Sequence, residues 1–159
     1  MTEFGFYHLT RTSLEDALPR LLTKVLQTGK RALVRVTDGE RMTRLDAHLW
    51  TFGEGSFLPH ATMRDARAER QPVLLTTASS DNPNDAGYLF LIDQASGEDA
   101  GSFERCFELF NGRDEEAVSA ARNRWRWATA KGFACIYWQQ EPGGKWVKGG
   151  ASRAGNAEL

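Results

Sequence analysis

The sequence predicts an α/β protein: a three-layer α/β/α sandwich on a mostly parallel or mixed sheet of about five to six strands. Strand-like and helix-like segments alternate along the first 140 residues, which is typical of such sheets. The run at 88–92 is apolar at every position, as a strand buried on both faces should be. The chain has 159 residues, 41% of them hydrophobic, which suits one domain whose core needs neither metals nor disulfides.

Short apolar and aromatic runs mark the predicted strands, and helix-like segments lie between them at 12–29, 39–52 and about 114–131. The expected strands are 4–9, 32–36, 73–76, 88–92, 105–110 and 133–138. The turn cluster Asn82-Pro83-Asn84-Asp85 separates the third run from the fourth. A hairpin between these two runs would make the sheet mixed.

The first helix has the clearest pattern. A cap at Thr12 or Ser13 precedes it, and Pro19 predicts either a kink or a late start. Its apolar residues follow the helical spacing of three and four: Leu14, Leu18, Leu21, Leu22 and Val25. A helix with such a stripe is expected to pack on one face of the sheet.

The ends and the cysteines bear on organisation and location. Residues 141–159 contain five glycines and are predicted to form a flexible C-terminal tail after a single domain at 1–140. The N-terminus lacks the pattern of a signal peptide, and no apolar run approaches the length of a membrane span. Cys106 and Cys135 fall in strand-like runs, as buried thiols of a reducing compartment do. We therefore expect a cytoplasmic protein.

Sequence motifs for chemistry are missing. The turn after the first strand, Thr10-Arg11-Thr12-Ser13, has no glycine that would let a pyrophosphate approach, and neither G-x-G-x-x-G nor a P-loop occurs. His8, His48 and His60 show no metal-ligand spacing. We expect a Rossmann-like sheet without a phosphate loop, no cofactor, no metal and no catalytic residues. A small nucleotide-binding α/β enzyme remains the alternative.

The charge balance argues against direct DNA binding. The chain has 20 basic and 21 acidic residues, and its net charge is -1. Proteins that hold the DNA backbone usually have a basic excess. Any contact with DNA is therefore expected to be indirect, through a partner protein.

The longest predicted helix carries a mixed surface. Trp125 lies at one edge of its apolar arc, and Arg122 and Arg126 lie just beyond that edge. Trp50 lies at the edge of the second helix's apolar stripe, with Phe57 shortly after. If the two helices are neighbours, these five residues line a groove for a peptide with apolar and acidic parts that ends in a carboxylate. Alternatively, the tryptophans belong to the core and the arginines to a solvated face.

Several segments resemble one known family. They are Arg44-Leu45-Asp46-Ala47-His48-Leu49-Trp50-Thr51-Phe52, Ser56-Phe57-Leu58-Pro59-His60, Gln71-Pro72-Val73-Leu74-Leu75 and Ala121-Arg122-Asn123-Arg124-Trp125-Arg126 with Gly132-Phe133. With the aromatic start Phe6-Tyr7, they resemble the chi subunit of bacterial DNA polymerase III over about residues 4–138.

The resemblance implies a fold, partners and a site. It implies a non-catalytic α/β/α adaptor of the clamp loader that binds the psi subunit and the acidic, Phe-terminated tail of the single-stranded-DNA-binding protein. It implies that this tail docks against five side chains: Trp50, Phe57, Arg122, Trp125 and Arg126. Val118 stands one turn before Arg122, where a further basic residue would be expected for an acidic tail. The residues that bind psi do not lie in motifs that can be transferred.

Overall fold

The computed structural model describes residues 2–53 and 57–152, and its elements follow the predicted alternation. The strands are β1 (Glu3–Leu9), β2 (Ala32–Arg35), β3 (Ala61–Thr62), β4 (Val73–Thr76), β5 (Tyr88–Leu91), β6 (Arg105–Asn111), β7 (Ala134–Gln140) and β8 (Trp146–Ser152). The helices are α1 (Leu14–Gln27), α2 (Gly39–Thr51) and α3 (Glu115–Ala130), with short 3-10 turns at Ala68–Arg70 and Ala100–Ser102. The predicted α/β class is confirmed.

The described strands form one sheet of eight, in the order β3-β4-β2-β5-β6-β1-β7-β8. Neighbouring strands are parallel except β7 and β8, so the sheet is mixed, with more strands than the five to six predicted. The hairpin considered for the third and fourth runs does not form. These runs, β4 and β5, pair in parallel with opposite edges of β2 instead. The turn cluster at 82–85 therefore belongs to a longer connection.

The glycine-rich C-terminal segment, predicted as a flexible tail, contains a strand. Residues 146–152 form β8, which pairs antiparallel with β7. One glycine allows this close pairing: a Cβ placed on Gly149 would lie 2.7 Å from Cδ1 of Tyr137. Glycine lowers strand propensity, so the many glycines of this segment argued against a strand. In β8, however, Gly149 is needed because the Tyr137 ring leaves no room for a side chain. The rest of the predicted tail, 153–159, lies outside the described residues.

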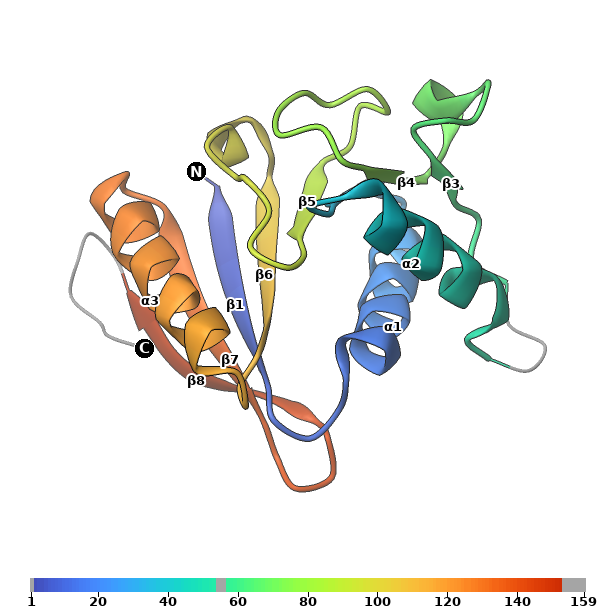
Figure 1. Cartoon of the computed structure of the whole chain (residues 1–159). Helices are drawn as coiled ribbons and strands as arrows, with labels where there is room; N and C mark the ends of the chain where they lie inside the picture. Colours follow the sequence, from blue (N-terminus) through green and yellow to red (C-terminus); the bar gives the residue numbers. More distant parts are fainter. Residues whose placement is uncertain (1, 54–56, 153–159) are drawn as a thin grey trace.

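The helices lie on both sides of the sheet, which makes the layers of the sandwich (Figure 1). Helices α1 and α2 pack on one face, where Leu22 and Leu45 join side chains such as Tyr7 of β1 in one apolar cluster. Helix α3 packs on the other face, where Trp125 joins Phe6 of β1 in a second cluster. Successive residues of β1 thus serve opposite cores, as the two-residue period of a strand requires.

On the face of the sheet that α3 packs against, loops cover β2, and Arg35 of β2 forms hydrogen bonds to them. Arg35 of β2 is fully buried and forms a two-pronged ion pair with Asp99, with N–O distances of 2.5 and 2.6 Å. Its guanidinium also donates to the carbonyl oxygens of Asp81 (2.7 Å) and Ser96 (3.1 Å). The two connections that flank β5 are therefore fastened to the middle of the sheet.

Pro19 does not delay the start of α1. The helix begins at Leu14, with Ser13 as its cap, and Pro19 lies inside it. A proline at this position removes the N–H that would donate to the carbonyl of Glu15. His48 of α2 compensates, because its Nε2 lies 2.6 Å from that carbonyl oxygen and can donate to it. The histidine of the second-helix motif thus ties α2 to α1.

This contact predicts a coupling between His48 and Pro19. His48→Ala should lower the free energy of unfolding by about 1–2 kcal/mol, because the Glu15 carbonyl loses its donor. In a Pro19→Ala background the backbone supplies that donor again, so the same substitution should cost about 1 kcal/mol less. Urea denaturation of the four proteins measures the coupling. Strictly additive losses would mean that the imidazole does not serve this carbonyl.

Candidate docking surfaces

Arg122 lies on α3 near two polar aromatic residues of neighbouring strands of the sheet. Its side chain is exposed, while His8 of β1 and Tyr137 of β7 are half-buried. The His8 Nδ1 and the Tyr137 hydroxyl lie 2.6 Å apart, and the His8 ring stacks on Phe110 at 4.8 Å between centroids. His8, Tyr137 and Phe110 thus form an aromatic floor in the neighbourhood of Arg122.

Electrostatic effects place the charge of Arg122 close to this floor. Burial lowers the pKa of His8, and the nearby Arg122 lowers it further, while a backbone contact with Gly112 acts in the opposite direction. Burial raises the pKa of Tyr137, and Arg122 partly offsets that effect. Both rings therefore stay neutral near pH 7, which leaves the positive charge of Arg122 available to a negative ligand.

The other two predicted residues of α3 differ sharply from each other. Arg126 is exposed and donates to the side-chain oxygen of Asn123 at 3.0 Å. Trp125 is only 3% exposed and lies in the core, with its ring centroid 5.1 Å from that of Phe6. Trp125 therefore offers little exposed ring to a groove in this structure, and its role in binding the tail stays a prediction. Its indole serves the packing of α3 on β1.

Trp50 and Phe57 form a second exposed aromatic surface. Trp50 at the end of α2 is 54% exposed, and Phe57 is 73% exposed. Their ring centroids are 6.1 Å apart, and the Trp50 ring lies 4.6 Å from His60. His60 is itself buried and fixed, because its ring nitrogens contact the carbonyl of Leu58 (2.7 Å) and the carboxylate of Asp46 (3.1 Å). Ser56, which begins this motif, lies outside the described residues.

The single groove expected from helix spacing is not formed. Helix α2 covers one face of the sheet and α3 covers the other (Figure 1), so the two helices do not lie side by side as that groove requires. A periodic pattern gives the angle of a side chain around its own helix, but not which face of a sheet that helix covers. Sequence analysis did not predict that His8 and Tyr137 lie near Arg122. The only indication in the sequence was that each carries a polar group within a largely apolar strand.

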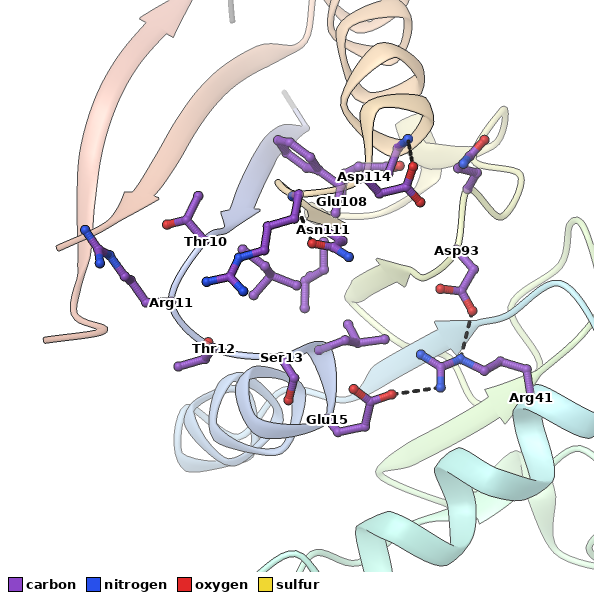
Figure 2. A pocket seen from close by; sticks show the side chains of 17 residues that line it. Thr10, Arg11, Thr12, Ser13, Glu15, Arg41, Asp93, Glu108, Asn111 and Asp114 are labelled. Carbon is purple, nitrogen blue, oxygen red and sulfur yellow. Dashed lines mark hydrogen bonds and ion pairs between the residues drawn. The ribbon is translucent and has the colours of Figure 1, made fainter. Parts of the chain in front are cut away.

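A pocket lies where the two helix layers diverge. At the carboxyl ends of β1 and β6, α1 and α3 leave toward opposite faces, and a cavity of about 600 Å³ opens between them (Figure 2). Doubly wound proteins hold their ligands at this kind of switch point. Arg41 lies in its wall and pairs with Glu15 (2.9 Å) and Asp93 (2.8 Å), as the dashed lines in Figure 2 show.

The helix starts beside this pocket are capped by the chain's own side chains. The Ser13 hydroxyl accepts a hydrogen bond from the amide of Asp16 at 3.2 Å. The carboxylate of Asp114 accepts from the amides of Glu116 (3.0 Å) and Ala117 (3.4 Å). An acid at the start of α3 uses the donors that would otherwise attract a phosphate and adds a negative charge there. The pocket is thus poorly suited to a nucleotide.

The remaining predictions about reactive groups concern cysteines, metals and membranes. Cys106 and Cys135 are both buried free thiols, as predicted, and burial raises the pKa of Cys135 to about 11. Across residues 2–53 and 57–152, no three His, Cys, Asp or Glu side chains gather in a way that could hold a metal ion. Over the same residues, no helix combines the length and apolar character needed to cross a bilayer.

Comparison with known proteins decides the family. Residues 1–135 match the family described as DNA polymerase III chi subunit, HolC. This chain belongs to the DNA polymerase III chi subunit family. It is similar to the "Probable DNA polymerase III subunit chi" of Rickettsia prowazekii (strain Madrid E), with 29% identity over 92 residues. That match covers 58% of this chain and spans about half the length of the relative (55%).

The chi-family match includes both docking surfaces except for Tyr137. Trp50, Phe57, Arg122 and Arg126 all lie within residues 1–135, whereas Tyr137, the rest of β7 and β8 follow the matched region. Most of β7 and all of β8 therefore extend the sheet beyond the family match. The five residues predicted as one site divide between two faces of this chi-family fold.

Proposed function

We propose that this chi-family protein is a cytoplasmic, non-catalytic adaptor that links the clamp loader to the single-stranded-DNA-binding protein. It would bind the psi subunit on one side and the acidic C-terminal tail of the single-stranded-DNA-binding protein on the other. DNA would be reached only through that second partner, consistent with the net charge of -1. An adaptor that holds two partners at once needs two separate surfaces, and the chain has two.

The observation that carries this proposal is the Arg122 surface. The resemblance to the chi family implies that the tail of the single-stranded-DNA-binding protein ends in a phenylalanine, with its terminal carboxylate, and that acidic residues precede this phenylalanine. Arg122 offers a guanidinium to that carboxylate, and the half-buried rings of His8 and Tyr137 offer apolar area to the phenylalanine ring. Arg126, one turn further along α3, would face the acidic residues upstream.

The Trp50 and Phe57 surface is proposed as the second docking site, for psi. Two exposed aromatic rings in contact with each other are uncommon on a free protein surface, and such rings are frequent anchors of interfaces. Because the Trp50 and Phe57 surface lies on the α2 side of the sheet, psi bound there would leave the Arg122 surface free for the tail. The expectation from the sequence that Trp50 and Phe57 bind the tail stays a prediction, and the Trp50→Ala variant below distinguishes it from this assignment.

A peptide titration tests the proposal. A peptide with the C-terminal sequence of the cognate single-stranded-DNA-binding protein should bind, and Arg122→Ala should weaken it by about 2 kcal/mol, roughly 30-fold in Kd. Amidation of the peptide should cause a similar loss in the wild type and little further loss in Arg122→Ala, because both changes remove one contact. Fully additive losses would place the carboxylate elsewhere.

Two control variants sharpen this titration. Arg126→Ala should cost only about 0.2–1 kcal/mol, a loss that shrinks as salt rises, because this arginine is exposed. Trp50→Ala should leave peptide affinity unchanged, because its ring lies on the α2 side. If Trp50→Ala instead weakened the peptide as much as Arg122→Ala, one continuous tail site would be indicated and the two-surface proposal would fail.

The alternative of a small nucleotide-binding enzyme has one observation in its favour, the pocket at the switch point. We expect it to fail, because Ser13 and Asp114 already satisfy the helix starts that would bind phosphate. Addition of ATP or NAD should therefore leave the melting temperature unchanged, since only a ligand of the folded state raises it. A clear, saturable rise with either compound would favour the enzyme.

A further inference from the structure

The loop between β1 and α1 aims three consecutive backbone amides at one oxygen atom. The N–H groups of Thr10, Arg11 and Thr12 all donate to Oε1 of Gln140, at 3.2, 3.0 and 3.2 Å. Successive amides that converge in this way form a nest, a concavity that binds anions in phosphate-binding loops. The oxygen of a neutral amide occupies the position that an anion's oxygen would take.

This nest lies at the point of the fold where phosphates are usually held. In doubly wound sheets, the loop that follows the first strand and precedes the first helix contacts the pyrophosphate of a nucleotide. Here that loop is Thr10–Ser13, between Leu9 at the end of β1 and Leu14 at the start of α1. The lack of glycine argued against phosphate binding from sequence, but the backbone amides themselves are arranged for an anion.

Gln140 is built into the site and is not a mobile surface group. It is the last residue of β7 and is only 9% exposed. Its amide nitrogen donates to the Thr12 hydroxyl (2.9 Å) and to the carbonyl of Gly144 (3.3 Å). The side chain thus joins the β1–α1 loop to the turn between β7 and β8, and both ends of its amide are satisfied.

We propose that the β1–α1 loop is an anion-binding nest, suited to phosphate, that this chain keeps closed with its own Gln140 side chain. The closure would hold the β7–β8 hairpin against the loop and exclude phosphate-bearing ligands from the switch point. This inference rests on hydrogen bonds that neither docking surface uses, although the loop follows β1 and Gln140 ends β7, the strands that carry His8 and Tyr137. It makes a gain of binding, and not only a loss of stability, the expected result of removing Gln140.

The test is thermal unfolding of the full chain with inorganic phosphate as the probe. At constant ionic strength, about 50 mM phosphate should leave the wild-type melting temperature unchanged and raise that of Gln140→Ala by about 5 °C. Gln139→Ala, at the exposed neighbouring position, is the matched control and should behave as the wild type does. A folded Gln140→Ala protein without a phosphate response would overturn the proposal, and so would an equal response in the wild type.

A second pair of variants decides the matter if Gln140→Ala does not fold. Gln140→Glu keeps an oxygen acceptor for the three amides, so its melting temperature should stay within a few degrees of the wild type, about the effect of 1 kcal/mol. Gln140→Met has a similar length but no acceptor, and it should lower the melting temperature by at least about 5 °C, because three amides lose their partner. Equal tolerance of both substitutions would show that Gln140 only fills space and would overturn the nest.

Discussion

Asp99→Ala should lower the free energy of unfolding by about 3 kcal/mol or more, the largest loss that we expect from a single substitution outside the apolar core. Arg35 is fully buried in β2, and without Asp99 its charge would have only carbonyl oxygens as partners. Loss of one member of a buried ion pair is costly because the other charge stays buried. Denaturation in urea at pH 7 measures the effect.

A surface ion pair supplies the matched control. Lys30 and Glu104 lie 3.0 Å apart with both side chains well exposed, so Glu104→Ala should cost at most about 1 kcal/mol. The double substitution Arg35→Met with Asp99→Leu should recover part of the Asp99→Ala loss, because no buried charge remains. If Asp99→Ala cost no more than Glu104→Ala, Arg35 would not depend on its carboxylate partner.

The same pair gives a defined response to acid. Hydrogen bonding from Arg35 holds the pKa of Asp99 below its ordinary value, although partial burial opposes this. A carboxyl with a depressed folded-state pKa stabilises the protein above its unfolded pKa, at about pH 4. That contribution is lost as the pH falls through the folded-state pKa, so the difference between wild type and Asp99→Ala should shrink in acid.

Glu108→Gln should remove a pH dependence of stability of about 3 kcal/mol between roughly pH 4.5 and 7. Glu108 is buried in β6, and burial raises its pKa to about 7 even though Arg124 lowers it. The Arg124 Nε lies 3.3 Å from Oε2 of Glu108, but that oxygen accepts no hydrogen bond within the described residues. Burial therefore outweighs an ion pair of poor geometry.

The sign of this effect follows from proton counting. Between about pH 4.5 and 7 the folded protein holds a proton on Glu108 that the unfolded chain releases, so stability falls as the pH rises through that window. Above it, the cost of the buried carboxylate is constant. Glutamine carries no such proton, so Glu108→Gln should be about as stable as the wild type at pH 5 and more stable at pH 8.

The difference between the two stability curves is the quantity to measure, because the lowered pKa of His8 also makes stability depend on pH. Its effect has the opposite sign and cancels when the curves are subtracted. Glu116→Gln, exposed in the first turn of α3, should show no comparable slope change and serves as the control. An unchanged slope in Glu108→Gln would mean that Glu108 is ionised throughout.

Local patterns predicted the elements of this fold because each depends on neighbouring residues. The apolar spacing from Leu14 to Val25 and the uniformly apolar run of β5 needed no long-range information. Strand β8 could not be predicted in this way, because its glycines oppose a strand unless a ring such as Tyr137 lies over them. The pairing of β4 and β5 with β2 likewise depends on the path of the whole chain.

The candidate site was predicted only in part for the same reason. Arg122 is exposed on α3, as its position around the helix predicted. The burial of Trp125 depends on its contact with Phe6 of β1, which the pattern of α3 alone does not contain. The hydrogen bond from the Thr10 amide to the Gln140 side chain joins residues about 130 positions apart, and no local pattern in either segment predicts it. Arg35 did carry a local signal, a lone charge in the apolar run of β2.

The position of β1 in the sheet has a consequence for how the protein is made. It is translated before its partners in the described sheet, β6 and β7, which lie about a hundred residues or more later in the chain. The part of the sheet formed by β6, β1 and β7 therefore cannot assemble until both later strands have been made, and until then Phe4 and Phe6 lack their final contacts. Such long-range parallel pairing closes large loops and slows folding. During translation, the apolar side chains of β1 are therefore exposed to aggregation until β6 and β7 are available.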